Sequence, residues 1–285
     1  MKIECRDVSY KYEIPGDEWA LKDIGLTIDQ GEKLAVIGPA GSGKTTLIQL
    51  LDALVLPSKG DVLFDGQSVR ALSKAKKLFS IRRRIGVLFQ FPEHQFFHET
   101  AYEELTFALR NFFDQGEEEI EKVSRSLMGR LGMDIDVLRR ISPFRLSSGE
   151  KRKLALASAL LSSPEVLILD EPTAGMDAQG RRELIRIISG LKDTTVVIVT
   201  HNLEDFLAHI HRCIGISRAR IVADLKREDL IARLDDMAAS GISPPLALSV
   251  RQGLEHEGVA SLKGIFDMET LLESLEKNFV SADEA

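Results

Sequence analysis

The chain has 285 residues, of which 44% are hydrophobic and 28% charged, with a net charge of −7. This composition indicates a folded globular protein, long enough for one large domain plus an appendage, and the negative charge argues against general nucleic-acid binding. No apolar run is long enough to cross a bilayer and the first residues do not resemble a signal peptide, so we expect a cytoplasmic protein. Cys5 and Cys213 lack metal-site spacing and are expected to be buried thiols.

Two kinds of strand pattern are present. Alternating apolar residues predict an antiparallel sheet near the N-terminus, from residues 3–12, 21–28 and 61–64. Continuous apolar runs predict parallel strands covered on both faces, at residues 33–37, 85–89, 165–169, 194–199 and 213–216. Amphipathic helices at residues 44–56 and 181–191 separate several of these runs. The predicted fold is an α/β structure with a wound parallel sheet.

Two further regions lack strand signals. Between Gln90 and Ser162 the pattern predicts an inserted helical subdomain, at about residues 91–162, with helices at 103–111, 117–131 and 151–161. After about residue 225 it predicts a C-terminal helical extension, residues 226–285, with amphipathic helices at 229–239 and 268–279. The first 225 residues would then form the main domain.

The strongest chemical motif is GPAGSGKT, which directly follows a predicted strand and directly precedes a predicted helix. It fits the phosphate-binding loop G-x-x-x-x-G-K-[ST], whose backbone amides surround the β-phosphate at the positive end of the helix. The lysine side chain reaches the β- and γ-phosphates and the final hydroxyl can bind Mg²⁺. The expected nucleotide-binding residues are Gly38, Pro39, Ala40, Gly41, Ser42, Gly43, Lys44, Thr45 and Thr46.

A second motif, VLILDE, is an apolar strand that ends in two carboxylates. Asp170 would emerge at the carboxyl end of the strand, where it can hold Mg²⁺. Glu171 can polarise a water molecule for attack on the γ-phosphate. We expect Pro172 to end the strand and let both side chains face the cleft.

Two more strand ends carry polar residues. His201 closes the strand at residues 194–200 and is predicted to contact the γ-phosphate, because a neutral imidazole can both donate and accept a hydrogen bond. Gln90 follows the strand at residues 85–89, and its amide oxygen could bind Mg²⁺. Position alone leaves the role of Gln90 open.

The segment RLSSGEKRK resembles a second anion site. Its Ser-Ser-Gly sequence opens a predicted helix at about residues 148–162, and backbone amides at such a start suit an anion. The chain has only one set of hydrolytic residues, so the second site raises the question of whose phosphate it holds.

Taken in order, GPAGSGKT, Gln90, LSSGE, VLILDEP, AGMD and His201 resemble the motifs of ATP-binding-cassette ATPases. The resemblance implies a P-loop NTPase (RecA-like) fold, binding of ATP and Mg²⁺, and an adenine-stacking role for Tyr12. It further implies a dimer in which Ser147, Gly149 and Glu150 contact the ATP of a second ATPase subunit. The sequence departs from the usual LSGGQ at Ser148 and at Glu150.

Two segments, FQFPEHQFF and SPFRLSSGE, are similar to those of the second ATPase subunit of energy-coupling-factor importers. This similarity implies a peripheral protein on the cytoplasmic face of the membrane, which energises import of a vitamin or a transition-metal ion. Its partners would be a paralogous or identical ATPase, a membrane-embedded coupling protein and a substrate-binding membrane subunit. The expected docking residues are Phe91, Pro92, Glu93 and Gln95, and Arg145 replaces the family's frequent Glu.

Other interpretations remain. The docking segment could instead be an apolar loop packed on the helical subdomain. The chain could serve another importer or exporter of the same superfamily, whereas a DNA-associated ATPase would need long coiled coils that are absent from the sequence. A basic cluster could touch lipid headgroups or nucleic acid, although a solvated face is the simpler interpretation; it comprises Lys74, Lys76, Lys77, Arg82, Arg83 and Arg84.

Overall fold

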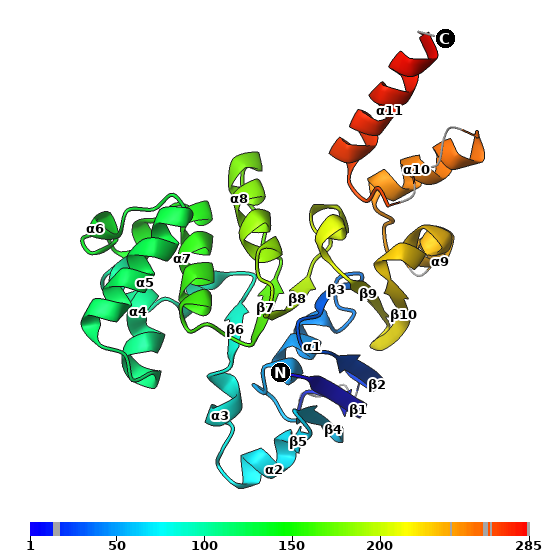
Figure 1. The fold of residues 1–285 in the computed structure, drawn as a ribbon. Helices are drawn as coiled ribbons and strands as arrows, with labels where there is room; N and C mark the ends of the chain where they lie inside the picture. Colours follow the sequence, from blue (N-terminus) through cyan, green and yellow to red (C-terminus); the bar gives the residue numbers. More distant parts are fainter. Residues whose placement is uncertain (14–17, 240, 259–261, 263, 284–285) are drawn as a thin grey trace.

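A computed structural model describes residues 1–13, 18–239, 241–258, 262 and 264–283. Its centre is a six-stranded sheet in the order β10-β9-β3-β8-β7-β6 (Figure 1). Five strands are parallel, as expected: β3 (Lys33–Ile37), β6 (Ile85–Leu88), β7 (Val166–Asp170), β8 (Thr195–Val199) and β9 (Arg212–Ser217). The sixth, β10 (Arg220–Lys226), is antiparallel to β9 and was not predicted.

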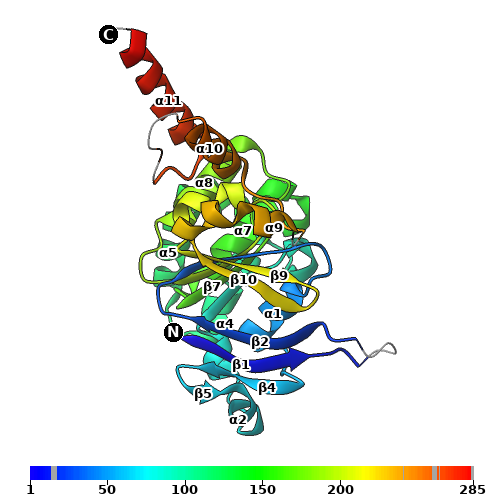
Figure 2. The same cartoon turned by 90° about the vertical axis from the view of Figure 1, so that its right-hand side faces the viewer.

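An antiparallel sheet formed near the N-terminus has the strand order β2-β1-β4-β5. Its strands are β1 (Ile3–Tyr10), β2 (Leu21–Ile28), β4 (Lys59–Phe64) and the short β5 (Gln67–Ser68). Figure 2 shows β1, β2 and β4 side by side below the main sheet. The two sheets confirm the predicted α/β fold of a P-loop NTPase.

The main sheet is buried on both faces. Along β3, Ala35 and Ile37 belong to one apolar core, while Leu34 and Val36 belong to a second core shared with the antiparallel sheet. The alternation of side chains along a strand produces this division. It explains why the parallel strands are continuous apolar runs. Cys213 lies in the first core and Cys5 in the second, and both are buried thiols, as expected.

Two core helices begin or end differently from the prediction. The helix α1 (Lys44–Leu51) ends five residues before the predicted end, because Ala53 adopts a left-handed backbone with a φ of 57° and the carboxylate of Asp52 accepts the N–H of Leu54. The helix α8 (Ala178–Ser189) begins three residues early, because Asp177 caps it through the N–H of Gly180.

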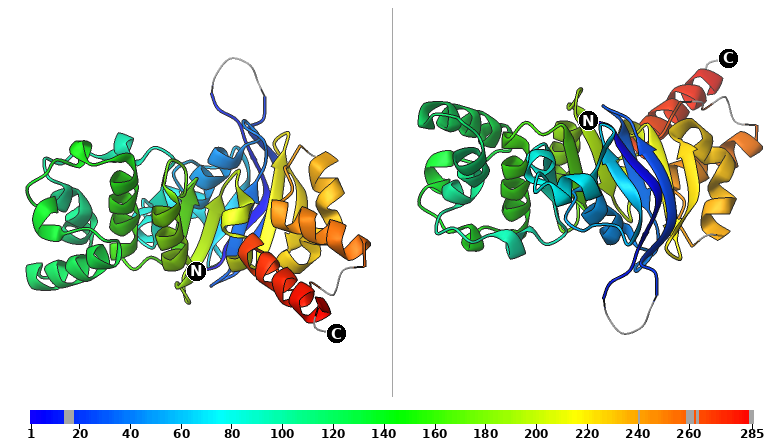
Figure 3. Two further views of the ribbon diagram at one scale, coloured as in Figure 1. Left: turned by 90° about the horizontal axis from the view of Figure 1, so that it is seen from above. Right: turned by 90° about the horizontal axis from the view of Figure 1, so that it is seen from below.

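A helical lobe lies between β6 and β7, as expected. It comprises η1 (Pro92–Gln95), α4 (Ala101–Phe112), α5 (Glu117–Arg130), α6 (Ile135–Leu138), η2 (Pro143–Arg145) and α7 (Ser148–Leu161). Seen from above and below, this lobe and the C-terminal helices lie on opposite sides of the two sheets (Figure 3). The helix α4 begins before its predicted start because Thr100 and Glu103 form a reciprocal capping box.

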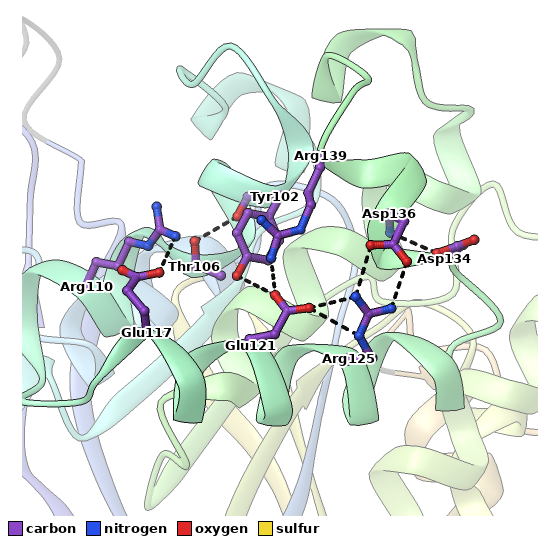
Figure 4. A network of polar contacts seen from close by, with 9 residues as sticks. All are labelled: Tyr102, Thr106, Arg110, Glu117, Glu121, Arg125, Asp134, Asp136 and Arg139. Atoms are coloured by element: carbon purple, nitrogen blue, oxygen red, sulfur yellow. Dashed lines mark hydrogen bonds and ion pairs between the residues drawn. The ribbon is translucent and has the colours of Figure 1, made fainter.

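A polar network holds the outer helices of this lobe together (Figure 4). The carboxylate of Glu121 on α5 accepts hydrogen bonds from Tyr102 on α4, at 2.9 Å, and from Arg139 after α6. Arg125 joins Glu121 to Asp136 of α6. A carboxylate shared by several donors fixes their relative geometry. The network therefore ties α4, α5 and α6 into one unit.

The C-terminal extension contains η5 (Arg227–Arg233), α9 (Leu234–Ala239), α10 (Leu246–His256) and α11 (Met268–Asp283). The predicted helix at 229–239 is therefore partly 3-10, and α10 was not predicted. On α11, Leu271 is buried and Leu272 is exposed, whereas the side chain of Phe279, at the end of the predicted helix 268–279, lies outside the described residues. No described helix has both the length and the apolar character needed to cross a membrane.

Candidate active site

The phosphate-binding loop connects β3 to α1, as predicted. Two of its glycines are required by crowding: a Cβ at Gly38 would lie 2.1 Å from the carbonyl oxygen of Ile216, and one at Gly43 would lie 2.5 Å from that of Ala20. Gly43 also has a φ of 110°, which side chains rarely allow. The loop is therefore held tightly between β9 and the antiparallel sheet, directly before the N-terminus of α1.

Lys44 lies over its own loop. Its ammonium group donates hydrogen bonds to the carbonyl oxygens of Gly38 and Pro39, at 2.8 and 2.9 Å. Burial lowers the pKa of Lys44 from its ordinary value, and the carboxylates of Glu171 and Asp170 oppose that shift. The phosphate-binding loop and the strand-end carboxylates are thereby placed within electrostatic range of each other.

The loop hydroxyls suit a bound phosphate and cation. The Thr45 side chain is exposed at the first turn of α1. The buried Oγ of Ser42 has no hydrogen-bond partner within the described part of the chain. A buried hydroxyl without a partner is costly, so an acceptor such as a phosphate oxygen suits this position.

Asp170 and Glu171 both lie at the carboxyl end of β7, and both are buried. The chain turns at Glu171 itself, which has a φ of 50°, one residue earlier than the turn expected from Pro172. Residues held in this region often belong to functional sites. Burial, reinforced by the carboxylate of Glu171, raises the pKa of Asp170 to about 6. Lys44 and Arg152 act in the opposite direction.

His201 lies beside Glu171. Its Nδ1 atom is 2.8 Å from Oε2 of Glu171, although the imidazole is 75% exposed. The hydroxyl of Thr200 donates to the same carboxylate oxygen at 3.4 Å. The ends of β7 and β8 thus bring together the predicted water-activating carboxylate and the predicted γ-phosphate contact.

Gln90 is brought close through its backbone. Its carbonyl oxygen accepts a hydrogen bond of 2.9 Å from Arg152, while the exposed amide side chain makes none of the described hydrogen bonds. Arg152 also donates to the carbonyl oxygen of Glu171. The buried Arg152, on α7, therefore connects Gln90, Glu171 and the helical lobe.

Sequence analysis did not identify Arg152. The available signal was an arginine on the face of α7 that carries Ala155 and Leu156. A charged side chain on an apolar face needs partners, and here they are two carbonyl oxygens. The sequence could not identify these partners, because they lie far from Arg152 in the chain, at the ends of β6 and β7.

Tyr12 lies near the loop, beyond the end of β1. Its hydroxyl is 3.1 Å from Oγ1 of Thr46 and donates to Gln49 on α1 at 3.0 Å. The ring of Tyr10 packs edge-on against it. The structure therefore places a partly exposed aromatic ring beside the first turns of the phosphate-binding helix.

The segment LSSGE forms the start of α7. The hydroxyl of Ser147 accepts the N–H of Glu150, and the carboxylate of Glu150 accepts the N–H of Ser147 at 2.8 Å and its hydroxyl at 2.7 Å. This capping box stabilises the helix start and lowers the pKa of Glu150. Gly149 has open space around it.

A cleft of about 500 Å³ lies at this helix start. It lies between the LSSGE segment and α8, and its described lining residues include none of the phosphate-binding loop. The lining comprises Ser147, Ser148, Gly149, Glu150, Lys153, Gly175, Met176, Asp177, Gln179, Gly180 and Glu183. The two predicted phosphate sites are therefore separate within one chain.

The predicted docking segment is only partly at the surface. Phe91 and Gln95 are exposed and Glu93 is half-buried, as a contact surface requires. Pro92 is buried, so its prediction as a docking contact was wrong: it starts the 3-10 turn η1 and packs inward. Phe97, which was not named as a docking residue, is 64% exposed.

The residues at this sheet edge fit a magnesium nucleotide. Thr45, Asp170 and Gln90 carry hydroxyl, carboxylate and amide oxygens, the atom type that Mg²⁺ prefers as a ligand. The described residues contain no cluster of three or more His, Cys, Asp or Glu side chains able to hold a metal alone. This suits an ion held largely by phosphate and water, in a loop that supplies amides and a lysine.

The loop, the strand-end carboxylates and the wound sheet define a P-loop nucleotide hydrolase. Residues 21–174 match the family model described as ABC transporter, and the chain belongs to this family and is an ATP-binding ATPase. It is 37% identical over 260 residues to the energy-coupling factor transporter ATP-binding protein EcfA2 of Bacillus licheniformis, covering 90% of this chain and 89% of that protein. Its identity to the EcfA2 protein of Symbiobacterium thermophilum is 40%, with 90% of each chain covered.

Solved structures agree on the fold. A dimeric ATP-binding cassette in a post-hydrolysis state, bound to ADP and Pi, matches with a TM-score of 0.70 and 26% identity, over 79% of this chain and 98% of that one. CbiO1 from Clostridium perfringens, part of the ABC transporter complex cbiONQ, matches with a TM-score of 0.70 and 29% identity. That match covers 89% of this chain and 98% of CbiO1.

Proposed function

We propose that this chain is the ATP-hydrolysing subunit of an energy-coupling-factor importer, located on the cytoplasmic face of the membrane. The observation that carries the proposal is the exposed aromatic segment next to Gln90, which is connected to the catalytic residues through Arg152. The names of the EcfA2 relatives support it.

ATP would be bound between two subunits. In this arrangement the loop and Lys44 of one subunit hold the phosphates, and the helix start at Ser147 and Gly149 in the second subunit meets the γ-phosphate. The support is the separation of the two sites within one chain, together with a solved relative that is a dimer bound to ADP and Pi. The positive end of α7 favours an anion there. The second subunit would be a paralogue or a second copy of this chain.

Each catalytic residue has a proposed role. Lys44 neutralises charge on the phosphates, and Thr45, Asp170 and Gln90 hold Mg²⁺, which would neutralise charge on the transferring group. Glu171 orients the attacking water and accepts its proton. His201, in contact with Glu171, would hold that carboxylate in place and donate a hydrogen bond to the γ-phosphate. Tyr12 would stack on adenine.

The docking segment has a fixed shape. The buried carboxylate of Glu104 on α4 accepts the N–H groups of Phe97 and His98, at 2.9 and 3.0 Å. The rings of Phe97 and Phe107 then meet edge-on at 5.1 Å. A rigid exposed aromatic group is typical of a partner surface. We assign this surface to a membrane-embedded coupling protein, which would in turn contact a substrate-binding subunit.

Docking and hydrolysis would be coupled through Arg152. Gln90 immediately precedes the docking segment, and Arg152 contacts the carbonyl oxygens of Gln90 and Glu171. A displacement at the docking surface would thus reach the residue that orients water. We assign residues 1–225 to the cassette, about 91–162 to its helical subdomain and 226–285 to an extension, with a vitamin or transition-metal ion as cargo.

The assembly can be tested by the dependence of ATPase activity on protein concentration. We expect the specific activity to rise with concentration as dimers form, or on addition of a paralogous ATPase. Full activity in a strictly monomeric sample would contradict the two-subunit site.

The transport role can be tested by capture from detergent-solubilised membranes of the source cell. We expect the tagged chain to retain integral membrane proteins, and a variant with Phe91→Ser and Phe97→Ser to lose them while it keeps its ATP affinity. Retention of the same proteins by both would remove the docking segment from its assigned role. A filter-binding assay with DNA is expected to be negative.

A further inference from the structure

The segment that precedes the docking residues has an unusual charge for this chain. Residues 66–92 contain seven basic and no acidic residues, whereas the whole chain has a net charge of −7. Within this segment lie α2 (Val69–Lys74) and α3 (Phe79–Arg82). This segment therefore has a net positive charge within an acidic chain.

Three of these basic residues have internal partners. Arg70 donates to the carbonyl oxygens of Gly60 and Pro57, and Arg82 donates to that of Ala53. Arg84 forms ion pairs with Asp65 and Glu165. These contacts tie the three side chains to the fold.

The other four form what we call the basic turn: Lys74, Lys76, Lys77 and Arg83. All four are exposed, and in the described part of the chain none of their side chains takes part in a hydrogen bond or ion pair. Val69, Leu72 and Ile81 anchor the two helices from the buried side. The backbone thus holds four uncompensated cations at one place on the surface.

The basic turn continues into the exposed aromatic rings of the docking surface. Phe79, which is 49% exposed, contacts Phe112 with the ring centroids 5.2 Å apart. Phe112 contacts Phe107 at 5.6 Å, and Phe107 contacts Phe97 at 5.1 Å. One row of rings therefore connects the docking segment to the cations.

The position of the basic turn suits a flat, anionic partner. In both side views α2 lies at one end of the molecule, and the C-terminal helix α11 lies at the opposite end (Figures 1 and 2). Exposed lysines and arginines beside an exposed aromatic ring are favoured at a membrane surface, where cations meet anionic headgroups and a ring enters the interface. The negative charge of the whole chain disfavours a long nucleic-acid track.

We propose that the basic turn contacts anionic phospholipid headgroups, and that Phe79 enters the same interface. This contact deepens the proposed function and rests on it for the orientation of this end of the molecule towards the bilayer. It adds a lipid-dependent contribution to assembly, next to the protein contact made by the aromatic rings. Because attraction to headgroups is electrostatic, it weakens with salt.

The test is co-sedimentation of the full chain with vesicles of phosphatidylcholine, with or without phosphatidylglycerol. The test variant carries Lys74→Ser, Lys76→Ser, Lys77→Ser and Arg83→Ser. The matched control removes the same charge from exposed residues on other elements, by Lys22→Ser, Arg130→Ser, Lys192→Ser and Arg218→Ser. ATPase activity and thermal unfolding of both variants report whether the fold is intact.

We expect the wild type and the control to bind phosphatidylglycerol vesicles in low salt and to bind pure phosphatidylcholine weakly. The test variant should bind phosphatidylglycerol at least about tenfold more weakly. Equal losses in both variants, or equal binding to both vesicle types, would overturn the proposal. Tighter binding of the wild type to duplex DNA than to the anionic vesicles, lost in the test variant, would identify a nucleic-acid site instead.

A protein partner is distinguished by the membrane capture described above, repeated in detergent without lipid. If the test variant binds vesicles like the control but loses the captured membrane proteins, the basic turn contacts an acidic protein surface and the lipid proposal is wrong. If the wild type captures no membrane proteins but binds anionic vesicles through the basic turn, the transporter assignment fails while the lipid contact stands.

Discussion

Oε2 of Glu171 lies 2.8 Å from Nδ1 of His201, and the hydroxyl of Thr200 approaches the same oxygen. Two adjacent residues that directly follow β8 thus contact a carboxylate that directly follows β7. Within the described part of the chain both contacts use Oε2, so Oε1 of Glu171 remains available to accept a proton. This arrangement suits a residue that orients water rather than one that binds metal.

Replacing Glu171 by Gln is therefore expected to preserve ATP binding and to lower kcat by at least about 100-fold, because the amide cannot accept the proton. Size-exclusion chromatography with ATP should show a long-lived dimer. The isosteric Glu118→Gln variant, exposed on α5 and outside both proposed phosphate sites, serves as the control. Undiminished turnover by Glu171→Gln would remove this residue from its assigned role.

Lys44 should contribute to ATP affinity itself. Its ammonium group lies over the loop, 2.8 Å from the carbonyl oxygen of Gly38, where the phosphates are expected to bind. We expect Lys44→Ala to weaken ATP binding at least about tenfold in calorimetry, because a charge-assisted contact with phosphate is lost. The control is Lys33→Ala, since Lys33 donates to the carbonyl oxygen of Ser189 instead. Unchanged affinity in Lys44→Ala would be inconsistent with the proposed site.

Glu150 places a negative charge beside the proposed γ-phosphate contact. Glutamine at this position can still accept the N–H and hydroxyl of Ser147, so Glu150→Gln should keep the capping box. Removing an exposed like charge should lower the ATP concentration for half-maximal activity by about two- to fivefold. Glu118→Gln, on the exposed face of α5, controls for net charge. A higher half-saturation would mean that the carboxylate assists binding.

Arg152 is predicted to position Glu171 and Gln90 through their carbonyl oxygens. Arg152→Ala should lower the free energy of unfolding by about 2–4 kcal/mol, because two buried acceptors lose their donor, and should lower kcat without changing ATP affinity. Arg152→Lys should recover part of kcat. Arg251→Ala removes another buried arginine, which donates to the carbonyl oxygen of Ile265 in the C-terminal extension, and serves as the structural control. Equal kcat in both alanine variants at a temperature where both are folded would reduce Arg152 to a structural role.

Asp52 should make stability depend on pH. Burial is the main cause that raises its pKa in the folded chain to about 6, from 3.8. Between these values the unfolded chain has released the proton and the folded chain retains it, so the free energy of unfolding falls as pH rises and levels off above about pH 6. The stabilisation that follows from the raised pKa of Asp52 is present in full only below pH 3.8, the ordinary pKa of the group.

Asp52→Asn removes this titration and keeps an acceptor for the N–H of Leu54. It should raise the free energy of unfolding at neutral pH by about 1–3 kcal/mol, with a smaller gain at about pH 5. Urea unfolding at both pH values measures the difference. Asp61→Asn is the matched control. A gain that is independent of pH would assign the effect to something other than the ionisation of Asp52.

The sequence predicted the catalytic cassette with few errors, because its signals are local. Gly38 and Gly43 are required by backbone crowding, and the apolar runs of β3, β7 and β8 are required by burial on both faces. Strand ends that carry Asp170 and His201 meet at one edge because parallel strands place their carboxyl ends together. Element ends were less accurate, as at α1, where the left-handed Ala53 ends the helix.

The sequence by itself determined the wound sheet, the phosphate-binding loop and the set of polar residues at the strand ends, since period and spacing follow from the backbone's own geometry. Only the tertiary structure decided that Arg152 connects Gln90 to Glu171, that Pro92 turns inward, and that Phe79 and Phe112 join the basic turn to the docking surface. These contacts join residues far apart in the chain, and their partners depend on how helices pack, which no local pattern records.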